Sequence, residues 1–224
     1  MGAQSAFKAP GDLPAVVAVF PLSGALLLPR GHVPLNIFEP RYLAMVDDAL
    51  ADRHRLIGMI QPDTGHPGSE SKPNLYKIGC LGRITQFAET GDGRYLIQLT
   101  GISRFRVLGE ESVTTPYRQC RITAEPFAAD FTPRAGEDEV DRATLIRVLR
   151  AYLTANNLQA DWEAIEQAPN EALVNALSMM SPFDSREKQA LLEAGSLKER
   201  AEILVAITEI ELAKGGSGGD TALQ

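Results

Sequence analysis

Residues 78–99 read IGCLGRITQFAETGDGRYLIQL, and this stretch decides the fold of the first half of the chain. Two apolar runs, 78–87 and 95–99, flank the tetrapeptide TGDG at residues 90–93. Glycine tolerates the positive φ angles of tight hairpin turns, so the tetrapeptide is a strong turn signal. The second run alternates large apolar residues with polar or smaller ones, which is the pattern of a half-buried strand. The stretch predicts two antiparallel strands joined by a short turn.

Short strand patterns continue on both sides of this hairpin. They cover residues 15–20, 33–37, 56–61, 105–107 and 120–122. Between the second and third of them the period changes, because apolar residues recur at i, i+3, i+4, i+7 and i+8 from Tyr42. This spacing predicts an amphipathic helix with Pro40 in its first turn. Short strands separated by turn residues are typical of a compact barrel or a strongly curved sheet.

The second half of the chain has a helical period throughout, beginning after a boundary predicted at residues 133–136, which read PRAG. Two capping boxes, Asp184 with Glu187 and Ser196 with Glu199, mark helix starts. In each box the side chains satisfy N–H groups that the first turn of a helix leaves unpaired.

These patterns divide the chain into two parts and two tails. We expect a β-rich module over residues 14–133 and a helical bundle over residues 134–213. Residues 1–13 and 214–224 are predicted to be disordered tails, because they are small, polar and rich in glycine, serine or proline. The predicted fold class is α+β, with the strands first and the helices after them.

The composition is that of an ordinary globular protein, with 224 residues, 24.3 kDa, 44% hydrophobic residues and a net charge of −7. Cys80 and Cys120 are too few for a disulfide framework and too far apart for a thiol redox pair. No stretch approaches the roughly 20 apolar residues of a membrane helix, and the N-terminus lacks a secretory signal pattern. We therefore expect a cytoplasmic protein that does not engage membranes.

The charges are spread unevenly along the chain. Residues 1–133 carry 13 basic and 13 acidic side chains, whereas residues 134–214 carry 9 basic and 15 acidic ones. Proteins that bind nucleic acid usually present a basic patch or a basic domain. The charge distribution therefore disfavours nucleic acid as a partner.

Motifs that carry chemistry are missing from the sequence. His32, His54 and His66 have no partners at the spacing of metal ligands, and the cysteines form no C-x-x-C pair. No phosphate-binding or dinucleotide-binding glycine motif is present. Paired carboxylates such as Asp47 and Asp48 are interpreted as solvated helix surface. We expect no catalytic residue, no metal and no cofactor, and hence a protein that is not an enzyme.

Several blocks of sequence together are more informative than any one of them. They are residues 19–22 (VFPL), 27–35 (LLPRGHVPL), 37–42 (IFEPRY), 76–84 (YKIGCLGRI), 92–95 (DGRY), 99–105 (LTGISRF) and 181–200. In this order the blocks resemble the N-terminal, substrate-binding domain of the Lon protease family. One block departs from the family, which commonly has Gly-Met after Pro29 where this chain has Arg30-Gly31-His32.

The resemblance implies a PUA-like β-barrel with one inserted helix, followed by a C-terminal helical bundle. In Lon proteases this region is associated with recognition of protein substrates, and ATPase and peptidase domains follow it. Neither domain has a counterpart in these residues, so we expect a stand-alone, non-catalytic member that binds polypeptides, as an adaptor or a quality-control factor. Its expected partners are polypeptide substrates or a protease, and a homo-oligomer is left open.

Phe38, Arg41 and Tyr42 are the candidate peptide-binding residues, because they lie where a strand meets the inserted helix. Binding would use apolar pockets or an exposed strand edge. The alternative is that Phe38 and Tyr42 only pack the helix onto the strands. A rival function is an RNA-binding module, since PUA-like barrels elsewhere bind RNA, although the balanced charge of residues 1–133 argues against it.

Overall fold

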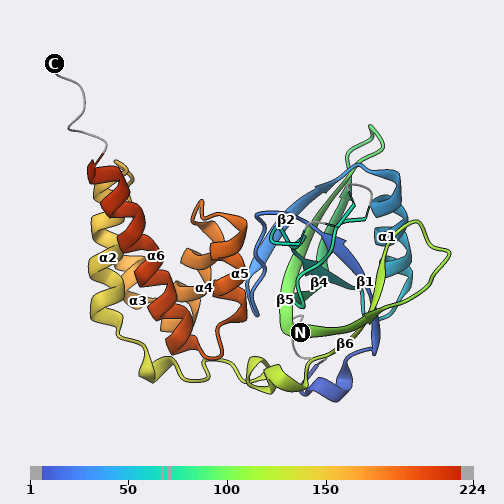
Figure 1. The fold of residues 1–224 in the computed structure, drawn as a ribbon, viewed down its shortest axis with the longest axis horizontal. Helices are drawn as coiled ribbons and strands as arrows, with labels where there is room; N and C mark the ends of the chain where they lie inside the picture. Colours follow the sequence, from blue (N-terminus) through green and yellow to red (C-terminus); the bar gives the residue numbers. More distant parts are fainter. Residues whose placement is uncertain (1–6, 67, 70–71, 218–224) are drawn as a thin grey trace. The chain divides into compact units, whose positions relative to one another are not determined.

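The computed structural model describes residues 7–66, 68–69 and 72–217. The chain divides into two compact units (Figure 1). The sheet unit consists of Met1–Pro133 and Phe183–Leu192, and the helical unit consists of Arg134–Pro182 and Glu193–Gln224. The sequence analysis grouped residues 183–192 with the other helices, whereas the structure groups them with the strands.

The sheet unit is built on six strands. They are β1 (Val16–Pro21), β2 (His32–Ile37), β3 (Leu56–Ile60), β4 (Ile78–Glu89), β5 (Tyr95–Glu110) and β6 (Gln119–Thr123). Their order is β2-β5-β4-β3-β1-β6, with one parallel pair, β1 and β3, and antiparallel pairs elsewhere. The predicted hairpin is confirmed as β4 and β5, which pair from Glu89 and Tyr95 at the turn.

The predicted PUA-like β-barrel is not confirmed, and the strands form one mixed sheet instead. The sequence analysis expected separate short strands, but β5 runs for 16 residues and pairs with β2, β4 and β6. Register shifts interrupt its pairing with β4 and with β6. Such irregularities bend a strand and increase its twist, so one long strand can pair with several neighbouring strands along its length.

The core of the sheet unit lies between these strands. Its main cluster contains Val17, Val19, Ile60, Leu81, Phe105, Cys120 and Ile122. Phe105 is fully buried, and its ring lies so close to Gly79 that a side chain there would overlap it. Burial of these apolar side chains is the main stabilising term of the unit.

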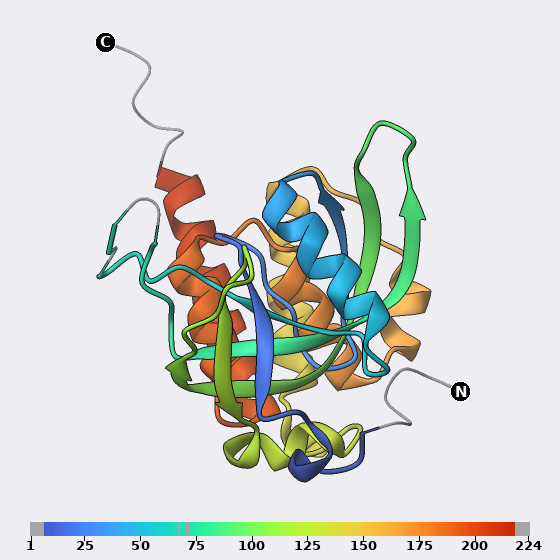
Figure 2. The ribbon, with the colours of Figure 1, turned by 90° about the vertical axis from the view of Figure 1, so that its right-hand side faces the viewer.

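The inserted helix is confirmed as α1 (Pro40–Ala51), with Pro40 in its first turn. Its buried side chains are Tyr42, Met45, Val46 and Ala49, which belong to the predicted apolar face. The rings of Tyr42 and Phe20 meet edge to face at 4.4 Å between centroids. Figure 2 shows α1 beside the hairpin of β4 and β5.

Part of the predicted N-terminal tail is ordered. Phe7 is buried against Leu56 and Ile102, and Pro10–Asp12 form a short 3-10 helix, η2. The prediction of disorder is therefore wrong for residues 7–13, because the aromatic ring of Phe7 has an apolar site to occupy. Residues 1–6 of that tail, and residues 218–224 of the other, lie outside the described residues.

Residues 183–192, which include helix α5 (Ser185–Glu193) except its last residue, join the sheet unit through apolar and polar contacts. Leu191 is fully buried. The buried side chain of Gln61 donates to Ser185 O and to Gln189 Oε1, at 3.0 and 3.1 Å. The Lys188 ammonium donates to Gly24 O at 2.9 Å, and burial lowers the pKa of Lys188.

A buried ion pair also ties the sheet unit together. Asp130, at the end of the 3-10 helix η3 (Glu125–Phe131), accepts hydrogen bonds from Arg104 N, Nε and Nη2 at 2.9–3.0 Å. Arg104 Nη1 donates to Leu192 O at 3.2 Å, and its guanidinium lies 4.7 Å from the ring centre of Phe127. The two charged side chains are 4% and 6% exposed as residues, so the pair is shielded from water.

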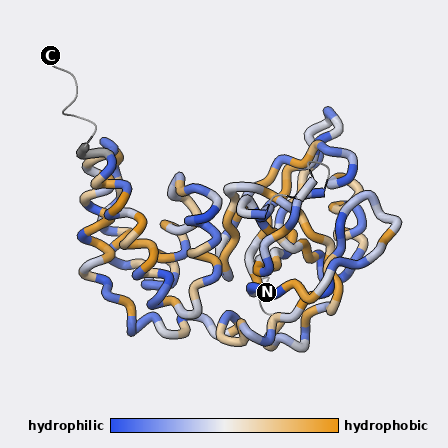
Figure 3. The backbone as a smooth tube through the Cα atoms, in the orientation of Figure 1, coloured by the Kyte–Doolittle hydropathy of each residue, from blue (hydrophilic) through white to orange (hydrophobic). Residues whose placement is uncertain are grey.

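The helical unit contains η4 (Glu137–Glu139), α2 (Arg142–Ala155), α3 (Trp162–Gln167), α4 (Asn170–Met180) and α6 (Leu197–Ser217). Hydropathy alternates along α2 and α6, as expected of helices with one buried side (Figure 3). Side chains cap the starts of α2 and α3, since Asp141 accepts from Thr144 N and Asp161 from Ala164 N. Helix α6 includes residues 214–217, which the sequence analysis assigned to a tail. Over the described residues, no helix combines the length and apolar character needed to cross a membrane.

Candidate functional site

Strand β2 lies at an edge of the sheet, because it pairs only with β5. Their antiparallel register runs from His32 opposite Thr100 to Ile37 opposite Tyr95. The side chains of β2 alternate between exposed and partly or fully buried positions. An edge strand of this kind is a potential site for an added strand from another polypeptide.

Pro34 interrupts the outer edge of β2. Gly101 N donates to Gly31 O at 2.9 Å, so the backbone N–H and C=O groups of Gly31 and of every second residue after it point toward β5. The backbone nitrogen of Pro34 consequently points away from β5, and it has no N–H to donate to an incoming strand. The edge favours recognition through side chains over a continuous backbone ladder.

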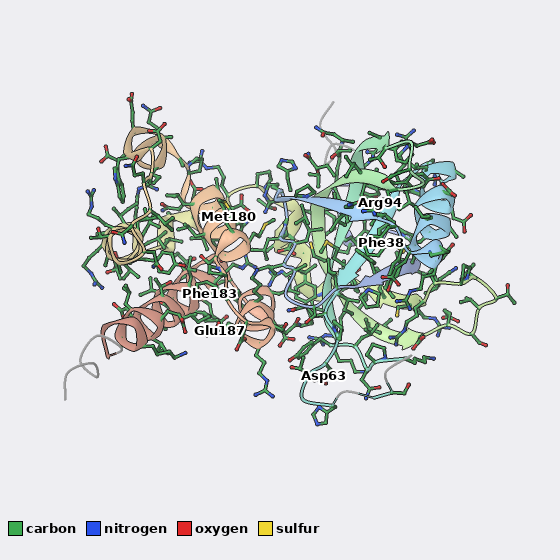
Figure 4. All side chains as sticks on the ribbon, turned by 90° about the horizontal axis from the view of Figure 1, so that it is seen from above. Phe38, Asp63, Arg94, Met180, Phe183 and Glu187 are labelled. Carbon is green, nitrogen blue, oxygen red and sulfur yellow. The ribbon has the colours of Figure 1, made fainter. Side chains whose placement is uncertain are left out.

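An exposed apolar surface lies where β2 ends and β5 begins. Phe38 is 61% exposed and Leu96 is 47% exposed. The Arg94 guanidinium lies 5.9 Å from the ring centre of Phe38, and both residues are labelled in Figure 4. Leu96 pairs with Asn36, and continuing this register by two residues places Phe38 opposite Arg94 on the same face. We call Asn36, Phe38, Arg94 and Leu96 the Phe38 surface.

The other two predicted site residues are placed differently. Tyr42 is buried, and burial raises the pKa of its phenol. The Arg41 guanidinium donates to Glu39 Oε2 at 2.8–3.0 Å and lies 4.6 Å from the ring centre of Tyr42. Tyr42 thus packs α1 onto the sheet unit, Arg41 covers it, and only Phe38 projects a large apolar side chain into solvent.

Two tyrosines anchor α1 beside this surface. A hydrogen bond to Asp47, followed by burial, raises the pKa of Tyr95. Tyr117 OH donates to Asp48 Oδ2 at 2.5 Å. The acidic side of α1, which the sequence analysis interpreted as solvated helix surface, therefore has structural partners on β5 and on the segment before β6.

Raising the pH is expected to destabilise the sheet unit through Tyr117. Burial, and then the hydrogen bond to Asp48, raise the pKa of Tyr117 to about 12 from its ordinary value of 10.0. The folded phenol holds its proton more tightly than the unfolded one, so its stabilising contribution is complete below pH 10.0 and is lost as the pH rises toward about 12. The midpoint of urea unfolding should fall over this window, and less steeply for Tyr117→Phe. Identical pH profiles for the two proteins would exclude this role.

The described residues contain no group of three or more histidine, cysteine, aspartate or glutamate side chains that could hold a metal ion. What they offer at the Phe38 surface is shape, apolar area and one guanidinium. The sequence analysis missed Arg94 and Leu96 as members of this surface. The hairpin register, extended to β2, is the signal that would have found them.

Comparison with known proteins identifies relatives over most of the chain. Residues 16–209 match the family model for the ATP-dependent protease La (LON) substrate-binding domain. Lon protease 2 of Sorangium cellulosum is 30% identical over 205 residues, which cover 88% of this chain and 25% of that protein. The Lon protease of Anaeromyxobacter dehalogenans is 25% identical over 203 residues, which cover 88% of this chain and 23% of that protein. The chain thus spans about a quarter of the length of these relatives.

Two solved structures share the fold. The N-terminal domain of the Mycobacterium avium complex Lon protease has a TM-score of 0.61 at 19% identity, covering 87% of this chain and 98% of that one. The Lon N-terminal domain protein from Xanthomonas campestris has a TM-score of 0.60 at 20% identity, covering 86% of this chain and 98% of that one.

Proposed function

The chain belongs to the Lon substrate-binding domain family, and on this premise we propose that it binds polypeptides through the Phe38 surface. The observation that carries the proposal is the exposed pair of Phe38 and Leu96, held on one face by the β2–β5 register. Adjacent exposed apolar side chains with polar neighbours are typical of interaction sites. An aromatic ring next to a guanidinium also resembles the residues that dominate protein interfaces.

The mode of binding follows from the chemistry of the surface. Pro34 limits backbone pairing along β2, so the polypeptide would be held through its side chains. Apolar side chains would cover Phe38 and Leu96, while the Arg94 guanidinium would donate to carbonyl or carboxylate oxygens of the ligand. Binding of this kind tolerates many sequences, which suits an adaptor that presents polypeptides to a protease or a quality-control factor that holds them.

Phe38→Ala is expected to weaken polypeptide binding by about tenfold or more, because it removes the largest exposed apolar contact of the surface. The measurement is fluorescence anisotropy with labelled, reduced and carboxymethylated α-lactalbumin, a polypeptide that stays unfolded. Leu108→Ala is the matched control, since Leu108 is 60% exposed and lies at the opposite end of β5.

Equal affinity of wild type and Phe38→Ala would rule out this surface as the binding site. Failure of the wild type to bind any unfolded polypeptide, together with salt-sensitive binding of RNA, would favour the rival RNA-binding function. The sheet unit carries 15 basic and 15 acidic side chains, which gives it no excess positive charge for phosphate contacts.

A further inference from the structure

The helical unit contains an apolar pocket of about 180 Å³ between α2, α4 and α6. Leu149, Leu177 and Val205 contribute to its walls. Its lining also includes Leu158 and Met180, which are 53% and 82% exposed, so these side chains can contact a ligand entering from solvent. Met180 is labelled in Figure 4, at the end of α4.

The size of the pocket indicates what it can hold. Pockets for cofactors and drug-sized molecules have volumes of about 300–1,000 Å³, which exceeds the 180 Å³ found here. An apolar cavity of about 150 Å³ in another protein binds one benzene molecule. The pocket therefore matches a single bulky apolar side chain, such as that of phenylalanine or leucine.

The charge of the helical unit indicates what should flank that side chain. Over its described residues the unit has 7 basic and 13 acidic side chains, a net charge of −6. Glu202 and Glu209 lie three residues before and four residues after Val205, so all three share one stripe of α6. Glu209 also pairs with Arg147 at 3.0 Å, which leaves Glu202 as the carboxylate of this stripe that has the clearer access to a ligand.

We propose that this pocket binds one bulky apolar side chain of a polypeptide segment whose flanking residues are lysine or arginine. The inference rests on the proposed function and specifies a substrate class for it. Burial of the apolar side chain in the pocket stabilises the complex because apolar surface leaves water. The flanking lysine or arginine residues stabilise it through attraction to the negative charge of the helical unit. An anionic lipid or an acidic peptide would be repelled by the same charge.

The first test uses a set of 15-residue peptides on the full chain. The parent peptide has one central phenylalanine, two lysines on each side and glycine–serine spacers. We expect the parent to bind at least tenfold more tightly than a version with alanine at the centre, and more tightly than one with glutamate in place of lysine. Raising the salt concentration from about 50 to 300 mM should weaken binding of the parent peptide, because the Debye length shortens and the attraction between the charges is screened. Equal affinity of all three peptides would overturn the proposal.

The second test locates the bound side chain. A photoreactive benzoylphenylalanine replaces the central phenylalanine, and mass spectrometry maps the cross-links. Cross-links at Met180 or Leu158 support the pocket. Cross-links confined to the Phe38 surface, together with lost binding in Phe38→Ala, overturn the pocket but leave the proposed function standing. Cross-links at Met180 with unchanged binding in Phe38→Ala retain the pocket and reject the Phe38 surface.

Variants separate occupation of the pocket from effects on folding. Val205→Phe places a ring in the pocket and should reduce parent binding at least tenfold, while Met180→Ala removes an exposed side chain of the lining and should reduce it severalfold. Ile210→Ala is the matched control, because Ile210 is 53% exposed on α6 and does not line the pocket. If Val205→Phe does not fold, the binding of Met180→Ala and the positions of the cross-links decide whether the pocket holds the side chain. Full binding of the parent peptide by Met180→Ala, without cross-links at the pocket, overturns the proposal. An affinity for benzene-sized molecules or for a second copy of the chain that equals the affinity for the parent peptide would also overturn it.

Discussion

Asp130→Ala should lower the free energy of unfolding of the sheet unit by about 3–5 kcal/mol. The change removes the carboxylate that accepts from Nε and Nη2 of the buried Arg104 guanidinium. It also removes the acceptor of Arg104 N. A charge that has left water and lost its counterion is strongly destabilising, whereas the intact pair is close to neutral.

Urea unfolding followed by far-UV circular dichroism measures this loss. Tryptophan fluorescence is the wrong probe, because Trp162 lies in the helical unit. Arg121→Ala is the control, since it breaks the exposed pair with Glu111 and should change stability by less than about 1 kcal/mol. The double variant Arg104→Met/Asp130→Leu should recover part of the loss, because no unpaired charge remains.

If Asp130→Ala lowers the free energy of unfolding no more than Arg121→Ala does, the Arg104–Asp130 pair does not have the proposed stabilising role. The same change should also loosen α5, because Arg104 Nη1 donates to Leu192 O. Amide hydrogen exchange in residues 185–192 should accelerate along with exchange in β5. Exchange that changes in neither segment would show that the pair does not secure α5.

Gly101→Ala should destabilise the sheet unit by about 3 kcal/mol or more. An added Cβ would overlap the carbonyl oxygen of Leu28 and lie 2.8 Å from its carbonyl carbon. The backbone cannot move away, because Gly101 accepts from Arg30 N at 2.8 Å and donates to Gly31 O at 2.9 Å. The close approach of these two segments therefore requires a residue without a side chain.

Gly109→Ala is the control for this prediction. Gly109 lies in the same strand, and no atom is within 4 Å of the position of its added Cβ. This substitution should be neutral or slightly stabilising, because glycine loses more conformational freedom on folding than alanine does. Thermal unfolding of the two variants side by side measures the difference, and similar melting temperatures would exclude the steric argument.

Local signals in the sequence predicted elements well. The TGDG tetrapeptide at residues 90–93 placed the turn between β4 and β5, and the period from Tyr42 placed the buried face of α1. The first capping box is complete, since Asp184 N donates to the Glu187 carboxylate and Glu187 N donates to the Asp184 carboxylate. At the second, Glu199 N donates to Ser196 Oγ at 3.1 Å, and the Glu199 carboxylate accepts from Gly195 N at 2.6 Å. Each of these features depends on residues within about one turn or one hairpin of one another.

The candidate site was predicted only in part. Phe38 was identified from its position between a strand and a helix, and it is the exposed aromatic residue among the three candidates. Tyr42 has the same aromatic character and the same neighbourhood in sequence, yet it is buried against Phe20. Burial depends on which way each side chain faces, and this is set by the pairing of β2 with β5 and by the packing of α1.

The sequence by itself determined the strands of the hairpin, the inserted helix, the capped helix starts and the membership of the Lon substrate-binding domain family. These depend on turn chemistry, local periodicity and ordered blocks of residues. Only the tertiary structure decided that β5 serves three strands, that Arg104 meets Asp130, and that residues 183–192 join the sheet unit. Those contacts join residues far apart in the chain, and they form because apolar surface must be buried and buried polar groups must be paired.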